Sequence, residues 1–353
     1  MHHELEGRDR EPLIDANCKS EEEKTLRALM IQLQADGKRE KVLVDDWADL
    51  PPIKEDQVRT ETLLSGLTNG TERNGLICGN YAPSDRSLPT GSGYQNVGRV
   101  IEVGSEVDDL EVSDVVYSSQ GHYGYCTLRP HKLENLMPHE RHDGLLIKLD
   151  PRVDPTHAAL FGVASVAMRC CRNADLRMGE RFLVIGAGMV GQMAAQIGNA
   201  MGAHVTICDI DQKRLDIAES AGAVEVTVNV SEDGWEQQIE DASYDTILDV
   251  AGVVGMEDKL IRATKHGGSI LFIAGRFKVE YTFNLGQHRE INIKQNSHFD
   301  KDDLDNLQRL VARGVVNMAP LILDIVPVLE AKPIYDRLRD QPQELLGTVF
   351  DWR

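Results

Sequence analysis

Three glycines within a ten-residue stretch carry the clearest chemical signal of this 353-residue chain. Residues 182–191 read Phe-Leu-Val-Ile-Gly-Ala-Gly-Met-Val-Gly, an apolar run that contains the spacing G-x-G-x-x-G. In a strand–turn–helix unit, Gly186 permits the tight turn, Gly188 lets the backbone approach a pyrophosphate, and Gly191 lets the helix pack closely on the strand. A helix over Met189–Met201 would then direct its free N–H groups and its positive dipole end at the phosphates.

An acidic residue follows the next predicted strand, His204–Cys208. Asp209 lies 21 residues after Gly188, where a carboxylate can accept hydrogen bonds from the adenine ribose of NAD and would repel the 2′-phosphate of NADP. The combination predicts dinucleotide binding with NAD as the cofactor, against the alternative of a glycine-rich turn that binds no ligand. The residues expected to hold the phosphates and the adenosine are Gly186, Gly188, Met189, Val190, Gly191, Asp209, Ile210 and Arg214.

Two patterns of predicted elements surround this motif. Before Pro151, short β-like runs separated by Gly-, Pro- and Asn-rich turns predict a small, irregular β-barrel. After Pro151, a helix over His157–Ala174 precedes strands that alternate with helices, which predicts an α/β fold with a doubly wound parallel sheet. The expected divisions are a polar arm at 1–25, a catalytic domain at 26–155, a NAD-binding domain at 156–300, and a C-terminal segment at 301–353 that returns to the catalytic domain.

The charge balance and the cysteine pattern limit the possible partners and compartments. Acidic residues outnumber basic ones by 57 to 38, for a net charge of −19, so nucleic acids and anionic membranes are not expected partners. No apolar run is long enough to span a bilayer, and the first residues lack the apolar core of a signal peptide. The six cysteines form no C-x-x-C pair, which favours reduced thiols in the cytoplasm.

Several stretches resemble the medium-chain dehydrogenase/reductase family, in which a GroES-like β-barrel precedes a Rossmann domain. Residues 98–107 resemble the family's strand pair G-x-V-x-E-V-G-x-x-V, and residues 114–117 resemble its G-D-x-V step. Residues 249–252 and 267–275 resemble the loops that flank the nicotinamide. The resemblance implies that the nicotinamide ribose is lined by Val250, Ala251, Ala274, Gly275 and Arg276, although Arg276 fits a surface ion pair equally well.

A branch of the family without zinc provides the closest resemblance. Its members include dehydrogenases of bacteriochlorophyllide side chains and relatives of sugar and polyol dehydrogenases. Residues 65–72, Ser-Gly-Leu-Thr-Asn-Gly-Thr-Glu, resemble that branch's S-G-I-S-x-G-T-E, and residues 93–98 resemble its G-Y-x-x-V-G. The positions of the zinc ligands correspond to Thr68 (or Thr71), Tyr94 with Gln95, and Phe161, none of which supplies a thiolate or imidazole. No metal is therefore expected, with Cys78 as the residue to reconsider if zinc is required.

Without a Lewis acid, hydrogen-bonding side chains must handle the substrate oxygen. The resemblance places Tyr94 at the position of the zinc-binding histidine and Thr71, or Thr68, at the hydroxyl that passes the proton. His122 lies on a loop that enters a barrel strand, and histidine titrates in the useful range. Tyr94 could instead be a core residue and Thr71 a turn cap. His298, after the last predicted strand, could also reach the cleft.

The expected function is zinc-independent, NAD-dependent oxidation of a secondary alcohol, in a sugar, a polyol or a natural product, with Tyr94 or His122 accepting the proton and Thr71 orienting the hydroxyl. One alternative is a zinc-free quinone or enoyl reductase, which would favour NADPH. The other is a dinucleotide-binding protein without catalysis. The resemblance also implies a homodimer, joined through edge strands of the Rossmann sheets around Ser269–Phe277.

Overall fold

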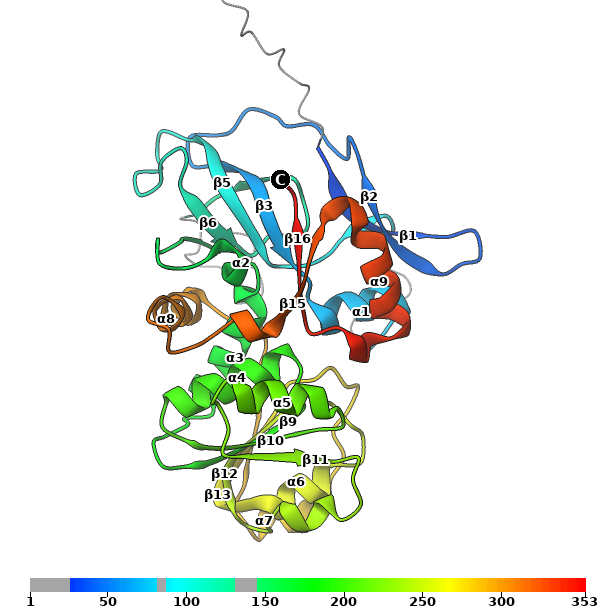
Figure 1. Ribbon diagram of the computed structural model, residues 1–353, viewed down its shortest axis with the longest axis vertical. Helices are drawn as coiled ribbons and strands as arrows, with labels where there is room; N and C mark the ends of the chain where they lie inside the picture. Colours follow the sequence, from blue (N-terminus) through cyan, green and yellow to red (C-terminus); the bar gives the residue numbers. More distant parts are fainter. Residues whose placement is uncertain (1–25, 81–86, 131–144) are drawn as a thin grey trace, which may run out of the picture.

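The computed structural model describes residues 26–80, 87–130 and 145–353, so the expected arm at 1–25 lies outside the described residues. Figure 1 shows two halves along the long axis of the molecule, with a parallel sheet in one half and mixed sheets in the other. Within the described part of the chain, no helix combines the length and apolarity needed to cross a membrane.

The second half is a doubly wound parallel sheet, as predicted. Its strands lie in the order β11-β10-β9-β12-β13-β14, and Figure 1 shows α4 and α5 on the face toward the first half and α6 on the opposite face. The strand order reverses between β9 and β12, which is the point where such sheets bind ligands at their carboxyl ends. The strands are β9 (Arg181–Ile185), β10 (His204–Asp209), β11 (Val226–Asn229), β12 (Tyr244–Asp249), β13 (Thr264–Phe272) and β14 (Asn292–Gln295), and the helices are α4 (Met189–Ala200), α5 (Gln212–Ser220), α6 (Glu257–Ala263) and α7 (Phe283–Gln287).

The first half contains two sheets that are largely antiparallel. The larger has the strand order β15-β16-β3-β5-β6-β8, with β7 paired to β3, and the smaller has the order β2-β1-β4. The C-terminal strand β16 pairs with β3, so the end of the chain lies beside the first half. The strands are β1 (Ala28–Leu33), β2 (Arg39–Val44), β3 (Val58–Gly66), β4 (Thr90–Gly91), β5 (Asn96–Val103), β6 (Val115–Ser118), β7 (Tyr125–Leu128), β8 (Leu146–Lys148), β15 (Ile322–Pro327) and β16 (Gly347–Asp351), and the helices are α1 (Asn69–Ile77) and α9 (Ala331–Asp340).

The two halves share one hydrophobic core. The short helix α2 (Pro155–Ala158) leads into α3 (Phe161–Asn173), which packs against α4 and against α8 (Lys301–Ala312). Buried side chains run continuously from Leu64 of β3 through Phe161 to Val184 of β9. Backbone also meets backbone here, because a Cβ atom on Gly66 would lie 1.8 Å from the carbonyl oxygen of Ala159. This packing sets the loops of the first half against the carboxyl ends of the parallel strands.

Candidate active site and cofactor-binding site

The glycine-rich turn has the geometry that the sequence predicts for a phosphate-binding loop. Gly186 has φ +104°, a conformation that glycine adopts without a steric penalty. A Cβ atom on Gly191 would lie 1.8 Å from the carbonyl oxygen of Gly186, whereas one on Gly188 would meet nothing within 4 Å. Gly188 precedes α4, and no side chain of the described residues caps this helix. The N–H groups at Met189 and Val190 are thus left for an anionic ligand.

Asp209 ends β10 beside this turn. Its carboxylate accepts hydrogen bonds from the backbone N–H groups of Ala187, at 2.6 Å, and Asp211, at 2.9 Å. The neighbouring Ile210 side chain is exposed, which suits the contact with the adenosine that the sequence predicts. The guanidinium of Arg214, which we expect near the adenosine, donates to the carbonyl oxygens of Gln343 and Leu345, each at 3.1 Å.

A buried ion-pair cluster supports the loops expected to flank the nicotinamide. Asp249 ends β12 and accepts hydrogen bonds from the N–H groups of Ala251, at 3.1 Å, and Gly252, at 3.0 Å. Arg276 lies between Asp249, at 2.6 Å, and Glu257, at 3.2 Å. The Arg276 side chain is only 7% exposed, so its ion pair is buried and not on the surface. The cation joins the loop after β13, which includes Ala274 and Gly275, to the loop after β12.

The side chains expected at the family's zinc-ligand positions supply no thiolate or imidazole and have other partners. Thr68 is buried and donates its hydroxyl to Glu72 at 3.0 Å. The amide of Gln95 donates to the carbonyl oxygen of Leu67, at 3.3 Å, and accepts from the N–H of Val163, at 2.9 Å. Phe161 is fully buried against Tyr117. In the described part of the chain no three His, Cys, Asp or Glu side chains converge as metal ligands would, and the donor set present does not suit zinc.

Tyr94 lies where the two halves meet. Its ring packs edge-on to the imidazole of His298, with 6.0 Å between ring centroids, and it also contacts Phe299 at 6.1 Å. His298 follows β14, so the pair joins a loop of the first half to the carboxyl edge of the parallel sheet. Nearby, the side-chain amide of Asn80 donates to the carbonyl oxygen of Gly275 at 3.1 Å. The first half therefore closes over the loop after β13.

Glu72 is the centre of a buried polar cluster in the first half of the molecule. Its carboxylate accepts from the N–H and hydroxyl of Thr68, at 2.9 and 3.0 Å. It also accepts from the hydroxyls of Ser92, at 2.8 Å, and Tyr335, at 2.7 Å. Nε2 of His122 lies 3.0 Å from the same carboxylate. The cluster holds Thr68 and Ser92, so it positions the backbone on either side of α1 and just before Tyr94.

Lys41 and the C-terminal segment complete the Glu72 cluster. Nζ of Lys41 lies 3.7 Å from the Glu72 carboxylate, and both side chains are 1% exposed. Nδ1 of His122 lies 2.8 Å from the hydroxyl of Ser65, which also accepts from the indole N–H of Trp352 at 2.8 Å. Burial alone would raise the pKa of Glu72, but His122 and Lys41 lower it far below its usual 4.5. Burial and the adjacent Glu72 raise the pKa of the Tyr335 phenol.

The structure separates the three expected catalytic residues. Tyr94 lines the junction of the two halves. His122 is 1% exposed and has both ring nitrogens within hydrogen-bond distance of Ser65 and Glu72, so it does not face that junction. Thr71 is exposed in the first turn of α1, whereas Thr68 points to Glu72. Cys78 is exposed at the carboxyl end of α1.

Comparison with known proteins finds relatives of this chain among dehydrogenases. Residues 189–313 match the family model described as zinc-binding dehydrogenase. The uncharacterized zinc-type alcohol dehydrogenase-like protein YdjJ of Escherichia coli is 28% identical over 70% of this chain and 78% of its own length. The chain is thus similar over much of its length to zinc-type alcohol dehydrogenase-like proteins of the medium-chain dehydrogenase/reductase family. Sorbitol dehydrogenase 1 of Saccharomyces cerevisiae, another relative, is 25% identical over 73% of this chain and 80% of its own length.

Relatives and solved structures span more than one named activity and cofactor. The NADPH-dependent alkenal/one oxidoreductase of Arabidopsis thaliana is 28% identical over 64% of this chain but only 57% of its own length. The 2R,3R-butanediol dehydrogenase of Bacillus subtilis has the same fold, with a TM-score of 0.76, 17% identity, and coverage of 93% of this chain and 100% of that one. A candidate zinc-binding dehydrogenase of Sinorhizobium meliloti 1021, solved with NADP, has a TM-score of 0.75 at 17% identity over 93% of this chain and 99% of its own. An alcohol dehydrogenase of Escherichia coli CFT073, solved with NADH, has a TM-score of 0.75 at 12% identity over 93% and 100%.

Proposed function

We propose that this member of the alcohol dehydrogenase-like family is a zinc-independent, NAD-dependent dehydrogenase that oxidises a secondary hydroxyl of a sugar, a polyol or a natural product. The observation that carries the proposal is the replacement of the metal donors around Tyr94. Gln95 and Phe161 occupy ligand positions with an amide and a hydrocarbon ring, and a phenol takes the place of an imidazole. A phenol can donate a hydrogen bond to the substrate oxygen. This hydrogen bond stabilises the negative charge that develops on the oxygen, which is the task that a Lewis acid otherwise performs.

The dinucleotide-binding residues fit NAD. The open surface at Gly188 and the uncapped start of α4 suit the pyrophosphate, and the carboxylate of Asp209 suits the two hydroxyls of the adenine ribose. The loops at Val250, Ala251 and Ala274 to Arg276 suit the nicotinamide half. When bound, NAD supplies the acceptor for the hydride that leaves the alcohol carbon.

The test is turnover by chelator-treated full-length protein with NAD⁺, across polyols, sugars and secondary alcohols that include sorbitol and 2R,3R-butanediol. We expect alcohol-dependent NADH formation that metal removal leaves unchanged, because side chains handle the substrate oxygen. Activity that is lost with the chelator and restored by zinc contradicts the proposal. NADPH-dependent reduction of enones or quinones, without alcohol oxidation, supports the reductase alternative.

Asp209 is expected to set the choice between NAD and NADP. Replacing Asp209 with Asn removes a charged acceptor, and hydrogen bonds to charged groups contribute about 1.5–3 kcal/mol. The Kd for NADH should therefore rise about 10- to 100-fold, while binding of NADPH is weakened less because the repulsion is relieved. Titration calorimetry with both dinucleotides measures this, with the exposed Asp233→Asn as the matched control. Equal binding of NADH and NADPH by the wild-type protein contradicts the assignment.

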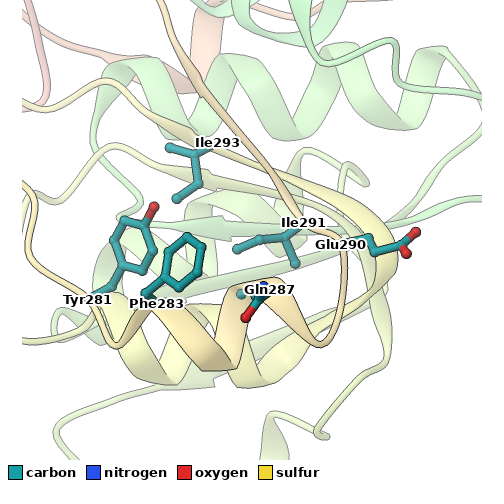
Figure 2. A pocket seen from close by; sticks show the side chains of 7 residues that line it. Tyr281, Phe283, Gln287, Glu290, Ile291 and Ile293 are labelled. Carbon is teal, nitrogen blue, oxygen red and sulfur yellow. The ribbon is translucent and has the colours of Figure 1, made fainter.

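We also propose a homodimer joined through the edge of the parallel sheet. The outermost strand there is β14 and not β13. We therefore place the contact between the two subunits at β14, next to the expected segment Ser269–Phe277. Phe277 and Phe283, on the segment before β14, are 87% and 65% exposed. Tyr281, Phe283 and Ile293 line a hollow of roughly 350 Å³ at this edge, shown in Figure 2. Apolar surface of this kind beside an open strand edge is suited to a second copy.

A further inference from the structure

His298 lies on an exposed loop of the second half and contacts Tyr94 of the first half. It lies three residues beyond the end of β14, on the carboxyl edge of the parallel sheet. Its φ of 53° is in the left-handed region, which costs a non-glycine residue free energy and is concentrated at functional sites. The residue is solvent-accessible while its imidazole contacts the ring of Tyr94. His298 thus connects the proposed substrate-binding phenol with solvent.

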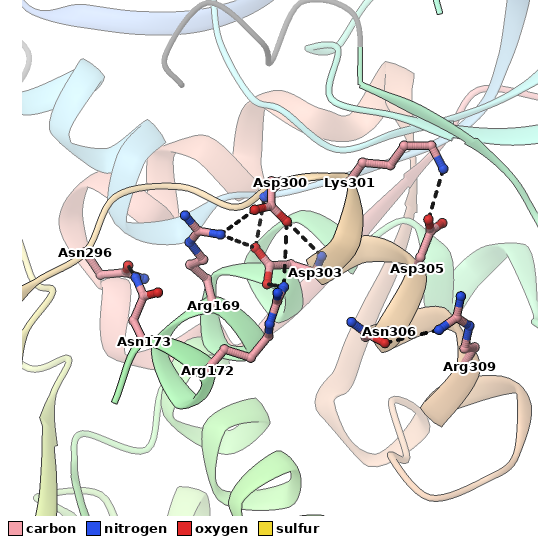
Figure 3. A network of polar contacts seen from close by, with 10 residues as sticks. All are labelled: Arg169, Arg172, Asn173, Asn296, Asp300, Lys301, Asp303, Asp305, Asn306 and Arg309. Atoms are coloured by element: carbon pink, nitrogen blue, oxygen red, sulfur yellow. Dashed lines mark hydrogen bonds and ion pairs between the residues drawn. The ribbon is translucent and has the colours of Figure 1, made fainter. Parts of the chain in front are cut away.

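A set of contacts from α3 holds the segment that carries His298, as Figure 3 shows. Before His298, the amide of Asn296 donates to Sγ of Cys170 at 3.4 Å and accepts a hydrogen bond from Asn173. Lys294 donates to the carbonyl oxygen of Asn173 at 2.8 Å. Both ends of the loop are fixed to one rigid helix, because Asp300 on the other side of His298 pairs with Arg169.

The charged groups around this loop are paired with one another. Arg172 pairs with Asp303, and Arg169 lies 3.5 Å from the same carboxylate. Asp300 and Asp303 cap α8 reciprocally, at 3.0 and 2.9 Å between side-chain oxygens and N–H groups. Two arginines thus balance two aspartates on the elements packed against the loop. Partial burial lowers the pKa of His298 below its usual 6.5, so the imidazole is neutral at pH 7.

We propose that His298 is the proton acceptor of the reaction, with Tyr94 as the hydrogen-bond donor that orients the substrate oxygen. The assignment rests on the proposed dehydrogenase function. His122 cannot take this role from its buried position against Ser65 and Glu72, because both of its ring nitrogens are engaged there.

The proposed step conserves atoms and charge. The O–H bond of the alcohol breaks, and its proton forms an N–H bond on the neutral imidazole of His298. The C–H bond breaks as the carbon–oxygen double bond forms, and bound NAD⁺ would accept the hydride with its electron pair. The imidazolium then releases the proton to water, to which His298 is accessible. Carbonyl reduction follows the same path in reverse.

The first experiment follows histidine resonances of the ¹³C-labelled full-length protein by NMR and needs no substrate. His298→Asn assigns the signal, and its pKa is measured alone, with NAD⁺, and with NADH. The positive nicotinamide ring of NAD⁺ disfavours a nearby imidazolium, so we expect NAD⁺ to lower the pKa of His298 by about one unit relative to NADH. The exposed His288 should not respond. A His298 signal unchanged by saturating NAD⁺ overturns the assignment, whereas failure of NAD⁺ to bind overturns the proposed function instead.

Kinetics provide the second readout, with the best alcohol of the panel described above. We expect His298→Asn to lower kcat about 10²-fold or more, the size of general-base effects, without changing the KM for NAD⁺ or the thermal unfolding temperature. The fall of kcat/KM at acid pH, which we expect from protonation of His298 in the wild-type protein, should disappear in the variant. Because burial lowers the pKa of His298, this fall lies on the acid side of the usual histidine range. Imidazole in solution should restore part of the activity of His298→Ala, and His288→Asn should behave as wild type. A His298→Asn enzyme with wild-type kcat and pH profile would falsify the inference.

Discussion

Replacement of Glu72 with Gln is expected to destabilise the protein by about 3–5 kcal/mol, the cost of breaking a buried ion pair. The carboxylate is 1% exposed and receives hydrogen bonds from Thr68, Ser92 and Tyr335. In the variant, the cation of Lys41 stays buried without its counter-charge. Because whole domains have only about 5–15 kcal/mol of stability, urea unfolding should show a much lower midpoint. The exposed Glu106→Gln is the matched control and should change stability by less than about 0.5 kcal/mol.

A second substitution tests whether charge causes the loss. Adding Lys41→Met to Glu72→Gln removes the stranded cation, so the double variant should be more stable than Glu72→Gln alone. A double variant that is less stable than Glu72→Gln contradicts the ion-pair account.

The Glu72 carboxylate should also affect how the free energy of unfolding falls at acid pH. Its folded pKa lies far below the usual 4.5 of an unfolded chain, so its contribution is complete above about pH 5 and is lost as pH falls toward the folded pKa. Unfolding measured at several acid pH values should therefore show a shallower loss of stability in Glu72→Gln than in wild type. Parallel curves for the two proteins argue against a carboxylate that stays ionised.

Replacement of Arg276 with Met is the second change with a large expected effect. Asp249 and Glu257 have side chains 1% and 4% exposed, and the variant leaves both carboxylates without a cation. We expect a loss of about 3–5 kcal/mol in unfolding free energy. Because Asp249 holds the N–H groups of Ala251 and Gly252, binding of NADH should weaken as well, which fluorescence titration would detect.

Lys278 provides the matched control for Arg276 on the same loop. Its pair with Glu280 has both side chains 72% exposed, and Lys278→Met should cost at most about 1 kcal/mol. Equal effects of the Arg276 and Lys278 substitutions would show that the buried cluster does not support the loops. If adding Asp249→Asn to Arg276→Met restores part of the lost unfolding free energy, the result supports a role of the buried cluster in holding the loops.

Local sequence patterns predicted the fold of the second half of the molecule. Gly186 has a positive φ, and a Cβ atom on Gly191 would clash with the backbone of Gly186, so both positions favour glycine and the residue types themselves indicate the loop. The alternation of apolar strands with helices between Arg181 and Gln295 likewise predicts the parallel sheet, because each element shows its own periodicity. The position of Asp209 was predictable for the same reason, because this residue stands at the end of the apolar strand β10.

Tertiary packing decided the roles of the polar residues in the cleft. His122 and His298 are both loop histidines in the sequence, and nothing local shows that one is buried against Glu72 while the other contacts Tyr94. Glu72 ends the motif at residues 65–72, but its partner Tyr335 lies 263 residues away. Arg276 was recognised near the nicotinamide loops, yet its burial depends on Asp249 and Glu257 from other segments.

The sequence by itself therefore determined the α/β architecture and the glycine-rich turn, because short-range residue patterns specify strands, helices and tight turns. Only the tertiary structure decided which histidine contacts Tyr94, which carboxylates are balanced by cations, and which strand forms the open edge of the sheet. These properties depend on contacts between segments that are distant along the chain. Burial and charge pairing at such contacts result from how α3, the parallel sheet and the C-terminal strands pack together.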